Sequence, residues 1–305
     1  MAEGYFDIQV NGYGGVDFNS DELSGEALHG ACAMLRAHGV DAVLATVITE
    51  RVEIMCARLA RLVKLRDSDP VVREVIAGFH IEGPFINETT GYRGAHPADA
   101  VIAADVDVAK RLLEAGGGLT RIVTLAPERD AGLRVTRLLA DSEIVISAGH
   151  CDPSLDQLRA ALDAGLTMFT HLGNGCPAQL PRHDNIVQRV LSLADRLWIC
   201  FIADGVHVPV FALRNYLRCA ALERCIVVTD AVAPAGLGPG RYRFARWELV
   251  IGPDLAARAP DGSHLIGSAM TMQQNQQNLR DGVGLTNEQC DRLLRVNPRR
   301  AIGGR

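Results

Sequence analysis

Four side chains that could carry out metal-dependent chemistry follow apolar runs of the chain: Glu82, His150, His171 and Asp230. Two neutral imidazoles and one carboxylate are the usual three ligands of a catalytic divalent metal, which keeps a further position open. Such a metal lowers the pKa of bound water from about 15.7 towards about 7, so that hydroxide becomes available near neutrality. A carboxylate beside that water is well placed as a general base. The pattern therefore predicts a metal centre with an acid-base group.

Each of these residues also has an ordinary explanation when taken alone. A lone Glu is most often a surface residue at a turn, and a lone His at a strand end is most often a hydrogen-bonded structural residue. Asp230 could be a fourth metal ligand, a general base or a helix cap. The segment from Ala231 to Pro234 does not resemble the start of a helix, which disfavours the cap. The recurrence of polar residues at strand ends favours one shared site.

The elements that must position these residues alternate along the chain. Near-continuous apolar runs, typical of buried parallel strands, alternate with segments of helical spacing, and this order selects a parallel α/β fold. Eight such units over about 250 residues predict a closed (β/α)₈ TIM-type barrel, whose active site lies at the C-terminal ends of the strands. An open doubly wound sheet is the alternative, but the glycines after the first strand match its phosphate fingerprint only loosely. The predicted strands are 5–10, 40–48, 75–81, 119–125, 144–148, 166–170, 197–203 and 225–229.

One segment interrupts this alternation. Residues 241–265 contain a near-alternating apolar stretch between turn signals, which predicts a small β-hairpin insert on a barrel loop. Helices at 270–279 and 288–302 are expected to close the fold. No linker, low-complexity segment or internal repeat is evident, so residues 1–305 are predicted to form a single domain.

Composition excludes several classes of function. The 305 residues are 48% hydrophobic and 22% charged, with a net charge of −5, which argues against a nucleic-acid-binding protein. No apolar run approaches the roughly 20 residues of a membrane span, and the first residues do not resemble a secretory signal. The eight cysteines are scattered, without a Cys-x-x-Cys pair. Reduced thiols and a cytoplasmic location are therefore expected.

Eight motifs, in order and together, resemble those of the N-acetylglucosamine-6-phosphate deacetylase family of the amidohydrolase superfamily. The resemblance extends from about residue 6 to 302. The motifs are FDIQVNGYGGVDFN (6–19), HIEGPFIN (80–87), GAH (94–96), SAGH (147–150), THLGN (170–174), ADGVHV (203–208), VTDA (228–231) and LIGSAMTM (265–272).

The resemblance implies a role for each site residue. Glu82, His150 and His171 would bind one divalent metal, with zinc expected and iron, manganese or cobalt compatible with the same ligands. Asp230 would act as general base and then as acid, and His96 would polarise the acetamide carbonyl. The substrate would be a small acetamido sugar, contacted by Ala95, Asn174, Gly175, Arg182, Asp204, His207, Leu265, Ile266 and Gly267.

The first strand supports a single metal. Many members of the superfamily carry His-x-His there and bind a second metal, whereas this chain has Gln9 and Asn11. Amides bind divalent metals poorly compared with imidazole. One metal per chain is therefore the expectation.

Two departures from the family pattern concern the phosphate and the architecture. The family usually shows Arg-Glu-Pro-Gly, whose Arg grips the substrate phosphate, often across a dimer interface. Here the stretch reads Arg182-His183-Asp184-Asn185, which questions the need for the phosphate. A homodimer is implied if Arg182 reaches a neighbouring subunit. The accessory β-sandwich of the family is expected to be missing. Deacetylation of an unphosphorylated acetamido sugar or another N-acyl compound, and non-catalytic binding of a sugar phosphate, stay open as alternatives.

Overall fold

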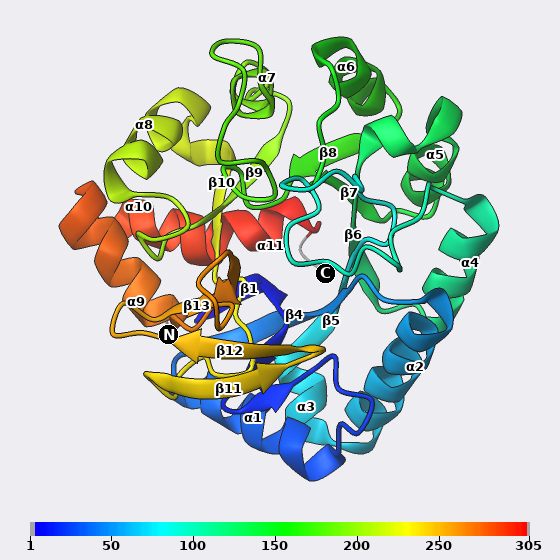
Figure 1. The fold of residues 1–305 in the computed structure, drawn as a ribbon. Coiled ribbons are helices and arrows are strands. Elements are labelled where there is room, and N and C mark those ends of the chain that lie inside the picture. Colours follow the sequence, from blue (N-terminus) through cyan, green and yellow to red (C-terminus); the bar gives the residue numbers. More distant parts are fainter. Residues whose placement is uncertain (1–3, 304–305) are drawn as a thin grey trace.

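A sheet of eight parallel strands forms the centre of the computed structural model, which describes residues 4–303 (Figure 1). Neighbouring strands in sequence are neighbours in space throughout the sheet. A backbone bridge between Val10 and Ala231 brings the last strand back to the first. The predicted eight-stranded parallel barrel is therefore confirmed. Its strands are β1 (Tyr5–Val10), β4 (Val40–Ile48), β5 (Ile76–Glu82), β6 (Thr120–Leu125), β7 (Val145–Ala148), β8 (Leu166–Phe169), β9 (Trp198–Ile202) and β10 (Cys225–Val228).

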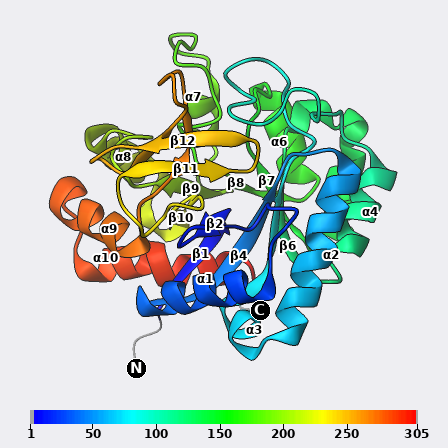
Figure 2. The same ribbon diagram turned by 60° about the horizontal axis from the view of Figure 1, so that its bottom comes forward.

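Helices surround the strands, as both ribbon views show (Figures 1 and 2). Several begin with an N-cap that the sequence supplies, such as the capping box formed by Ser154 and Gln157 at the start of α6. Asp69 caps the start of the short helix α3, and Pro70 occupies the first position of that helix. The helices are α1 (Gly25–Ala37), α2 (Val52–Ser68), α3 (Pro70–Val75), α4 (Val106–Ala115), α5 (Arg134–Asp141), α6 (Leu155–Asp163), α7 (Ile186–Leu191), α8 (Val210–Ala220), α9 (Met272–Gln277), α10 (Asn287–Asp291) and α11 (Asn297–Ala301).

Short turns of other helix types complete the chain. They are 3₁₀ turns at Pro127–Arg129, Ala131–Leu133 and Leu222–Arg224, and π-helical segments at Asn278–Val283 and Arg292–Val296. No helix within residues 4–303 has the length and apolar character needed to cross a membrane.

Strand alternation divides the side chains between two cores. In β5, Phe79 and Ile81 point outward into the core shared with the surrounding helices. His80 and Glu82 have the opposite parity and point into the barrel. The lower barrel interior is filled by apolar side chains from several strands, including Ile8, Leu44, Ile122, Met168, Ile202, Ile226 and Val228. The polar residues of the strand ends therefore lie above a closed apolar floor.

A second sheet covers part of the barrel mouth. The segment predicted as a hairpin forms four antiparallel strands: β11 (Gly240–Phe244), β12 (Trp247–Ile251), β13 (Ala256–Arg258) and β14 (Leu265–Ser268). A bridge between Ala231 and Ser268 joins this sheet to the barrel. The hairpin prediction missed β13 and β14, because strands of three and four residues carry too little alternation to be recognised. A two-stranded ribbon of β2 (Gly12–Tyr13) and β3 (Val16–Asp17) was also not predicted. The expected absence of an accessory β-sandwich stays a prediction.

Candidate active site

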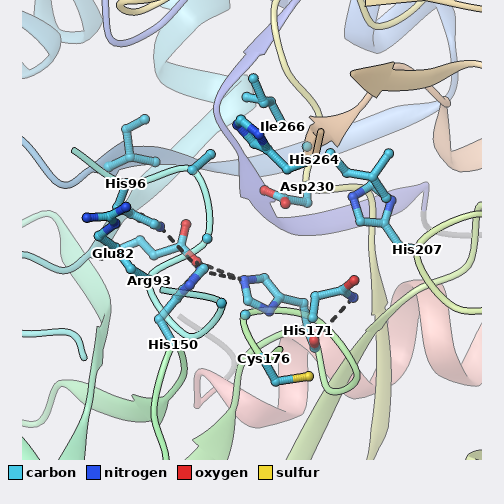
Figure 3. Close-up of a pocket in the computed structure, with 18 of the residues that line it drawn as sticks. Glu82, Arg93, His96, His150, His171, Cys176, His207, Asp230, His264 and Ile266 are labelled. Carbon is cyan, nitrogen blue, oxygen red and sulfur yellow. Dashed lines mark hydrogen bonds and ion pairs between the residues drawn. The ribbon is translucent and has the colours of Figure 1, made fainter. Parts of the chain in front are cut away.

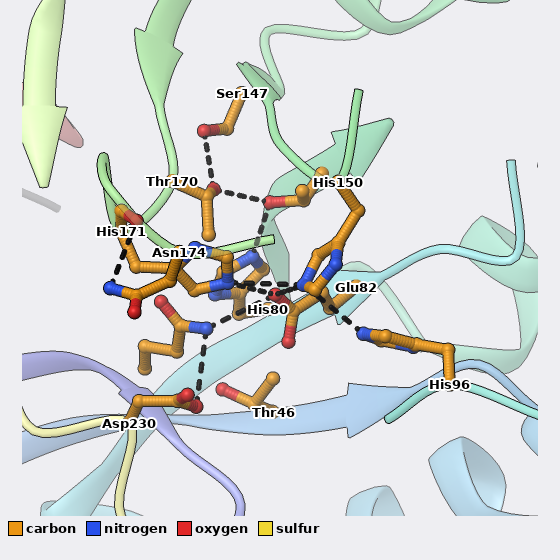
Figure 4. A network of polar contacts seen from close by, with 12 residues as sticks. Thr46, His80, Glu82, His96, Ser147, His150, Thr170, His171, Asn174 and Asp230 are labelled. Atoms are coloured by element: carbon orange, nitrogen blue, oxygen red, sulfur yellow. Dashed lines mark hydrogen bonds and ion pairs between the residues drawn. The ribbon is translucent and has the colours of Figure 1, made fainter. Parts of the chain in front are cut away.

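Glu82, His150 and His171 meet at the barrel mouth (Figures 3 and 4). Glu82 ends β5, while the two histidines lie two residues beyond β7 and β8. The Nε2 atom of His171 lies 3.0 Å from Oε1 of Glu82 and 3.1 Å from Nε2 of His150. The Nε2 atom of His150 lies 3.3 Å from the same Glu82 oxygen. Three donor atoms thus surround one point, in the arrangement that a single cation requires.

The backbone turns sharply at three of the site residues. His150, His171 and Asp230 have φ angles of 50°, 33° and 51°. Non-glycine residues rarely adopt this left-handed region, which costs of order 1–2 kcal/mol per residue. Each of these residues lies two positions beyond the end of a barrel strand, where the turn directs its side chain over the mouth. This shared strain is consistent with a functional site.

The imidazole of His150 is oriented so that its Nε2 could bind a metal. Its Nδ1 lies 2.8 Å from the carbonyl oxygen of Tyr92, and a carbonyl can only accept, so Nδ1 carries the proton. The lone pair of Nε2 then faces the other two donor atoms. Gly94 and Gly175, both with positive φ, pack against this ring, because a Cβ at either position would lie 3.1 Å or less from it.

The electrostatics of the trio also fit a divalent cation. Burial by itself raises the pKa of Glu82, but its hydrogen bonds with His150 and His171 outweigh burial and hold the pKa well below the usual range. Glu82 is therefore negatively charged at neutral pH. The Nδ1 atom of His171 is buried and has no hydrogen-bond partner among residues 4–303. The donor set of two imidazoles and one carboxylate is compatible with a metal.

Asp230 lies beside the trio and is held by two side-chain amides, one within β1 and one directly after it. Asn11 Nδ2 donates to Oδ1 of Asp230 at 2.7 Å, and Gln9 Nε2 lies 3.3 Å from the same oxygen. Gln9 Nε2 also lies 3.2 Å from Oε1 of Glu82. The two amides thus orient carboxylates, a role that the sequence did not reveal. The other oxygen of Asp230 accepts no hydrogen bond from the described residues.

Burial raises the pKa of Asp230 to about 6, and the negative charge of Glu82 adds to the shift. A carboxyl group with a pKa near neutrality can both accept and return a proton. The environment of Asp230 therefore suits a general base that later acts as an acid.

His96 approaches the trio from the loop after β5. Its Nε2 lies 3.2 Å from Nε2 of His150. Burial, with the nearby imidazole of His150, lowers the pKa of His96 to about 3, so its ring is neutral at pH 7. A neutral imidazole carries one proton and can donate one hydrogen bond to an incoming carbonyl.

Behind the trio, His80 belongs to a buried polar network (Figure 4). Its Nδ1 lies 3.0 Å from the carbonyl oxygen of Ile8, so Nδ1 donates and Nε2 accepts from Thr124 at 2.7 Å. Thr170 continues this chain of hydroxyl groups to Ser147. His80 therefore supports the site from below and does not complete the donor set.

A cavity of about 580 Å³ opens above these residues and contains most of the predicted substrate contacts (Figure 3). Predicted residues that line it are Glu82, Ala95, His96, His150, His171, Asn174, Gly175, His207, Asp230, Leu265, Ile266 and Gly267. Phe244 and Trp247, on the small sheet, add an aromatic wall that sequence reasoning missed. Arg246, in the turn between them, forms ion pairs with Glu50 and Asp99 and thereby anchors the sheet over the cavity.

Two predicted contacts do not line the cavity. Asp204 lies behind His207, where its Oδ2 accepts from Nδ1 of His207 at 2.6 Å and its side chain has no exposed surface. Asp204 thus holds the ring of His207 and is not among the residues that line the cavity. Arg182 is exposed on the loop after β8 and is not among the cavity residues. Its predicted reach into a neighbouring subunit stays a prediction.

Sequence reasoning also missed Arg93, which lines the cavity. The available signal was its place directly before Gly94, Ala95 and His96, a motif that was recognised. An Arg in a polar loop carries no sign of its own that it faces inward.

Comparison with known proteins places this site in a family. No model of a known protein family matches the chain. Human N-acetylglucosamine-6-phosphate deacetylase is 34% identical over an alignment of 318 positions, which covers 99% of this chain and 74% of the human protein. N-acetylgalactosamine-6-phosphate deacetylase of Escherichia coli O157:H7 is 29% identical, over 99% of this chain and 78% of that protein.

A solved structure agrees with these relatives. A mutant of N-acetyl-D-glucosamine-6-phosphate deacetylase from Mycobacterium smegmatis, in complex with N-acetyl-D-glucosamine-6-phosphate, superposes with a TM-score of 0.88 at 30% identity. The match covers 99% of this chain and 77% of that one. With the human relative above 30% identity over nearly the whole chain, the chain belongs to the N-acetylglucosamine-6-phosphate deacetylase family.

Proposed function

We propose that this protein is a metal-dependent hydrolase that converts N-acetylglucosamine 6-phosphate to glucosamine 6-phosphate and acetate. Family membership supports the reaction. The single observation that carries the proposal is the convergence of Glu82, His150 and His171 on one point, with Asp230 beside them. A bound divalent cation would supply Lewis-acid chemistry there, activating water and polarising the amide carbonyl.

The residues of the chain divide the remaining work. Asp230, held through one oxygen by Asn11 and Gln9, accepts the proton of the attacking water through its other oxygen and then delivers it to the leaving nitrogen. His96, neutral and next to His150, donates a hydrogen bond to the carbonyl oxygen as negative charge develops on it. Both roles require that the acetamide group enter between Asp230 and His96.

The sugar occupies the rest of the cavity. Polar contacts along one side come from Asn174, Gly175 and His207. The ring of His207 is fixed by its hydrogen bond to Asp204. Ala95 would contribute to the contacts with the sugar phosphate, and the loop of Leu265, Ile266 and Gly267 lines the cavity as well. A single domain with one metal ion per chain, zinc in the first place, completes the proposal, and iron, manganese or cobalt would suit the same donors. The homodimer implied by the family resemblance is part of the proposal as well.

Acetate release from the purified, metal-loaded protein tests the reaction. We expect acetate and glucosamine 6-phosphate in equal amounts. Metal analysis should find one equivalent per chain, and two equivalents would refute the single-site proposal. The absence of acetate release from any phosphorylated or plain acetamido sugar, with zinc, iron, manganese and cobalt each supplied, would refute the function. A chain that binds the sugar phosphate under those conditions without turnover would instead be a binding protein.

A second candidate function is deacetylation of an unphosphorylated acetamido sugar or another N-acyl compound. The observation that favours it is the position of Arg182, which is exposed and outside the cavity in this chain. Comparing kcat/KM for N-acetylglucosamine with and without the 6-phosphate separates the two. A clear preference for the phosphorylated sugar supports the first function, whereas equal or higher efficiency with the plain sugar supports the second.

A further inference from the structure

The cavity contains one permanently charged cation within residues 4–303, and it is Arg93. The remaining basic side chains that line it are imidazoles, most of which already have a partner. His150 and His171 belong to the metal trio, His207 is paired with Asp204, and His264 contacts the hydroxyl of Ser263. A phosphate monoester carries between one and two negative charges near pH 7. The cavity therefore offers such a group one strong counter-charge.

The guanidinium of Arg93 is unusual because its Nε is buried while none of its nitrogens has a partner among the described residues. Four arginines have a buried Nε without a hydrogen bond. In the other three, a second guanidinium nitrogen is satisfied: Arg121 by a carbonyl, Arg129 by Glu88 and Arg295 by Asp291. A buried N–H without an acceptor costs free energy. An acceptor from outside the chain would remove that cost.

The fold places Arg93 beside the residues expected to contact the sugar phosphate. Its loop packs against the loop after β8, since a Cβ on Gly91 would lie 2.7 Å from Pro177. Gly94, on the same loop, and Gly175, on the other, pack against the ring of His150. Arg93 thus shares one rim of the cavity with Asn174 and Gly175.

Arg182 has a different environment. It is exposed, lies outside the cavity and makes no ion pair within residues 4–303. The neighbouring Asp184, which could have competed for it, is bonded to Arg189 at 2.6 Å. Arg182 can bond to water, and it lacks the unsatisfied buried donor that distinguishes Arg93.

We propose that Arg93 binds the anionic phosphate of the substrate within its own subunit and so determines the preference for a phosphorylated sugar. The inference rests on the proposed function and adds the residue that reads the phosphate. A guanidinium presents two parallel N–H donors to phosphate oxygens, which gives geometric specificity as well as charge.

Steady-state kinetics with Arg93→Met, Arg93→Lys and Arg182→Met tests this assignment on N-acetylglucosamine with and without the 6-phosphate. Arg137→Met, an exposed residue of α5 outside the cavity, is the matched control for loss of one positive charge. We expect Arg93→Met to lower kcat/KM for the phosphorylated sugar about 10- to 100-fold, mainly through KM. The plain sugar should be affected less than about threefold, and Arg93→Lys should recover part of the loss because it keeps the charge.

Binding of glucosamine 6-phosphate to the metal-free proteins, measured by calorimetry, gives a readout that does not depend on turnover. Arg93→Met should weaken this binding by a similar factor, and Arg137→Met should leave it unchanged. Equal losses on both sugars, or unchanged binding of glucosamine 6-phosphate by Arg93→Met, would overturn the assignment. A loss confined to Arg182→Met would assign the phosphate to that residue instead. A wild-type protein that releases no acetate refutes the proposed function, while the binding measurement still tests Arg93.

Discussion

Replacing Asp230 with Asn should lower kcat and at the same time raise the stability of the fold. The side chains are nearly identical in shape, and an Asn oxygen can still accept from Asn11 and Gln9, which bond to Oδ1 of Asp230. The amide nitrogen then occupies the place of the oxygen that faces the substrate. Because an amide cannot accept a proton from water, the variant loses the general base. General acid-base groups contribute about 10²- to 10⁴-fold, and we expect a fall in kcat within that range.

The same substitution removes a charge that burial disfavours. The pKa of Asp230 is raised from an ordinary value of 3.8 to about 6, and each unit corresponds to about 1.36 kcal/mol. The folded protein binds this proton more tightly than the unfolded chain does, so ionisation destabilises the fold progressively between pH 4 and 6. Above pH 6 the cost reaches about 3 kcal/mol in metal-free protein. Asp230→Asn should be more stable than the wild type by up to this amount at pH 8, and little different at pH 4.

Urea denaturation of both metal-free proteins at pH 4 and pH 8 measures this difference, and acetate release by the metal-loaded proteins measures kcat. Metal content is determined in parallel, so that loss of metal is not mistaken for loss of the base. A kcat within tenfold of the wild type would refute the role of Asp230 in proton transfer. Equal stability of the two proteins at pH 8 would refute the conclusion that burial raises the pKa of Asp230.

Three further predictions concern the metal, the orientation of His207 and a second buried acid. Zn²⁺ at a hundredfold excess over its Kd should stabilise metal-free wild-type protein against unfolding by about 2.7 kcal/mol. The Glu82→Gln and His171→Ala variants should lose most of this stabilisation. If thermal denaturation shows that Zn²⁺ stabilises these variants as much as the wild type, the metal binds elsewhere. Asp204→Asn should raise KM about tenfold with a smaller change in kcat, because an amide bonded to Nδ1 of His207 can reverse which ring nitrogen carries the proton; unchanged KM would show that this pair has no part in binding. Burial raises the pKa of Asp7 to about 7 despite its hydrogen bonds from Thr229 and Gln9, so the contribution of Asp7 to stability should decline as pH rises from 4 to 7. Asp7→Asn should flatten that decline, and parallel denaturation profiles for the two proteins would contradict it.

The order and nature of the barrel elements could be predicted because their signals are local. Strands 40–48 and 225–229 were recognised within a residue of their observed bounds from continuous apolar runs. The residues Glu82, His150, His171 and Asp230 could be placed on one rim, because the C-terminal ends of parallel barrel strands all lie at the same end of the barrel. The number of strands in the small sheet was underestimated, because β13 and β14 have only three and four residues. Strands this short show too few alternations of apolar and polar residues to be recognised.

Interactions between distant residues decided the rest. The proton of His150 is placed by a carbonyl 58 residues away, and Asp230 is oriented by amides more than 200 residues away. No local pattern reports such contacts.

The sequence by itself determined the barrel and the family and pointed to Glu82, His150 and His171 as a candidate donor set, because strand order and strand-end residues follow short-range patterns. Only the tertiary structure decided that Arg93 faces the cavity while Arg182 and Asp204 do not line it. Both arginines lie in polar loops, and loop direction depends on packing between segments that are far apart in the chain, such as Gly91 against Pro177. Which charge meets the substrate is therefore a property of the folded molecule.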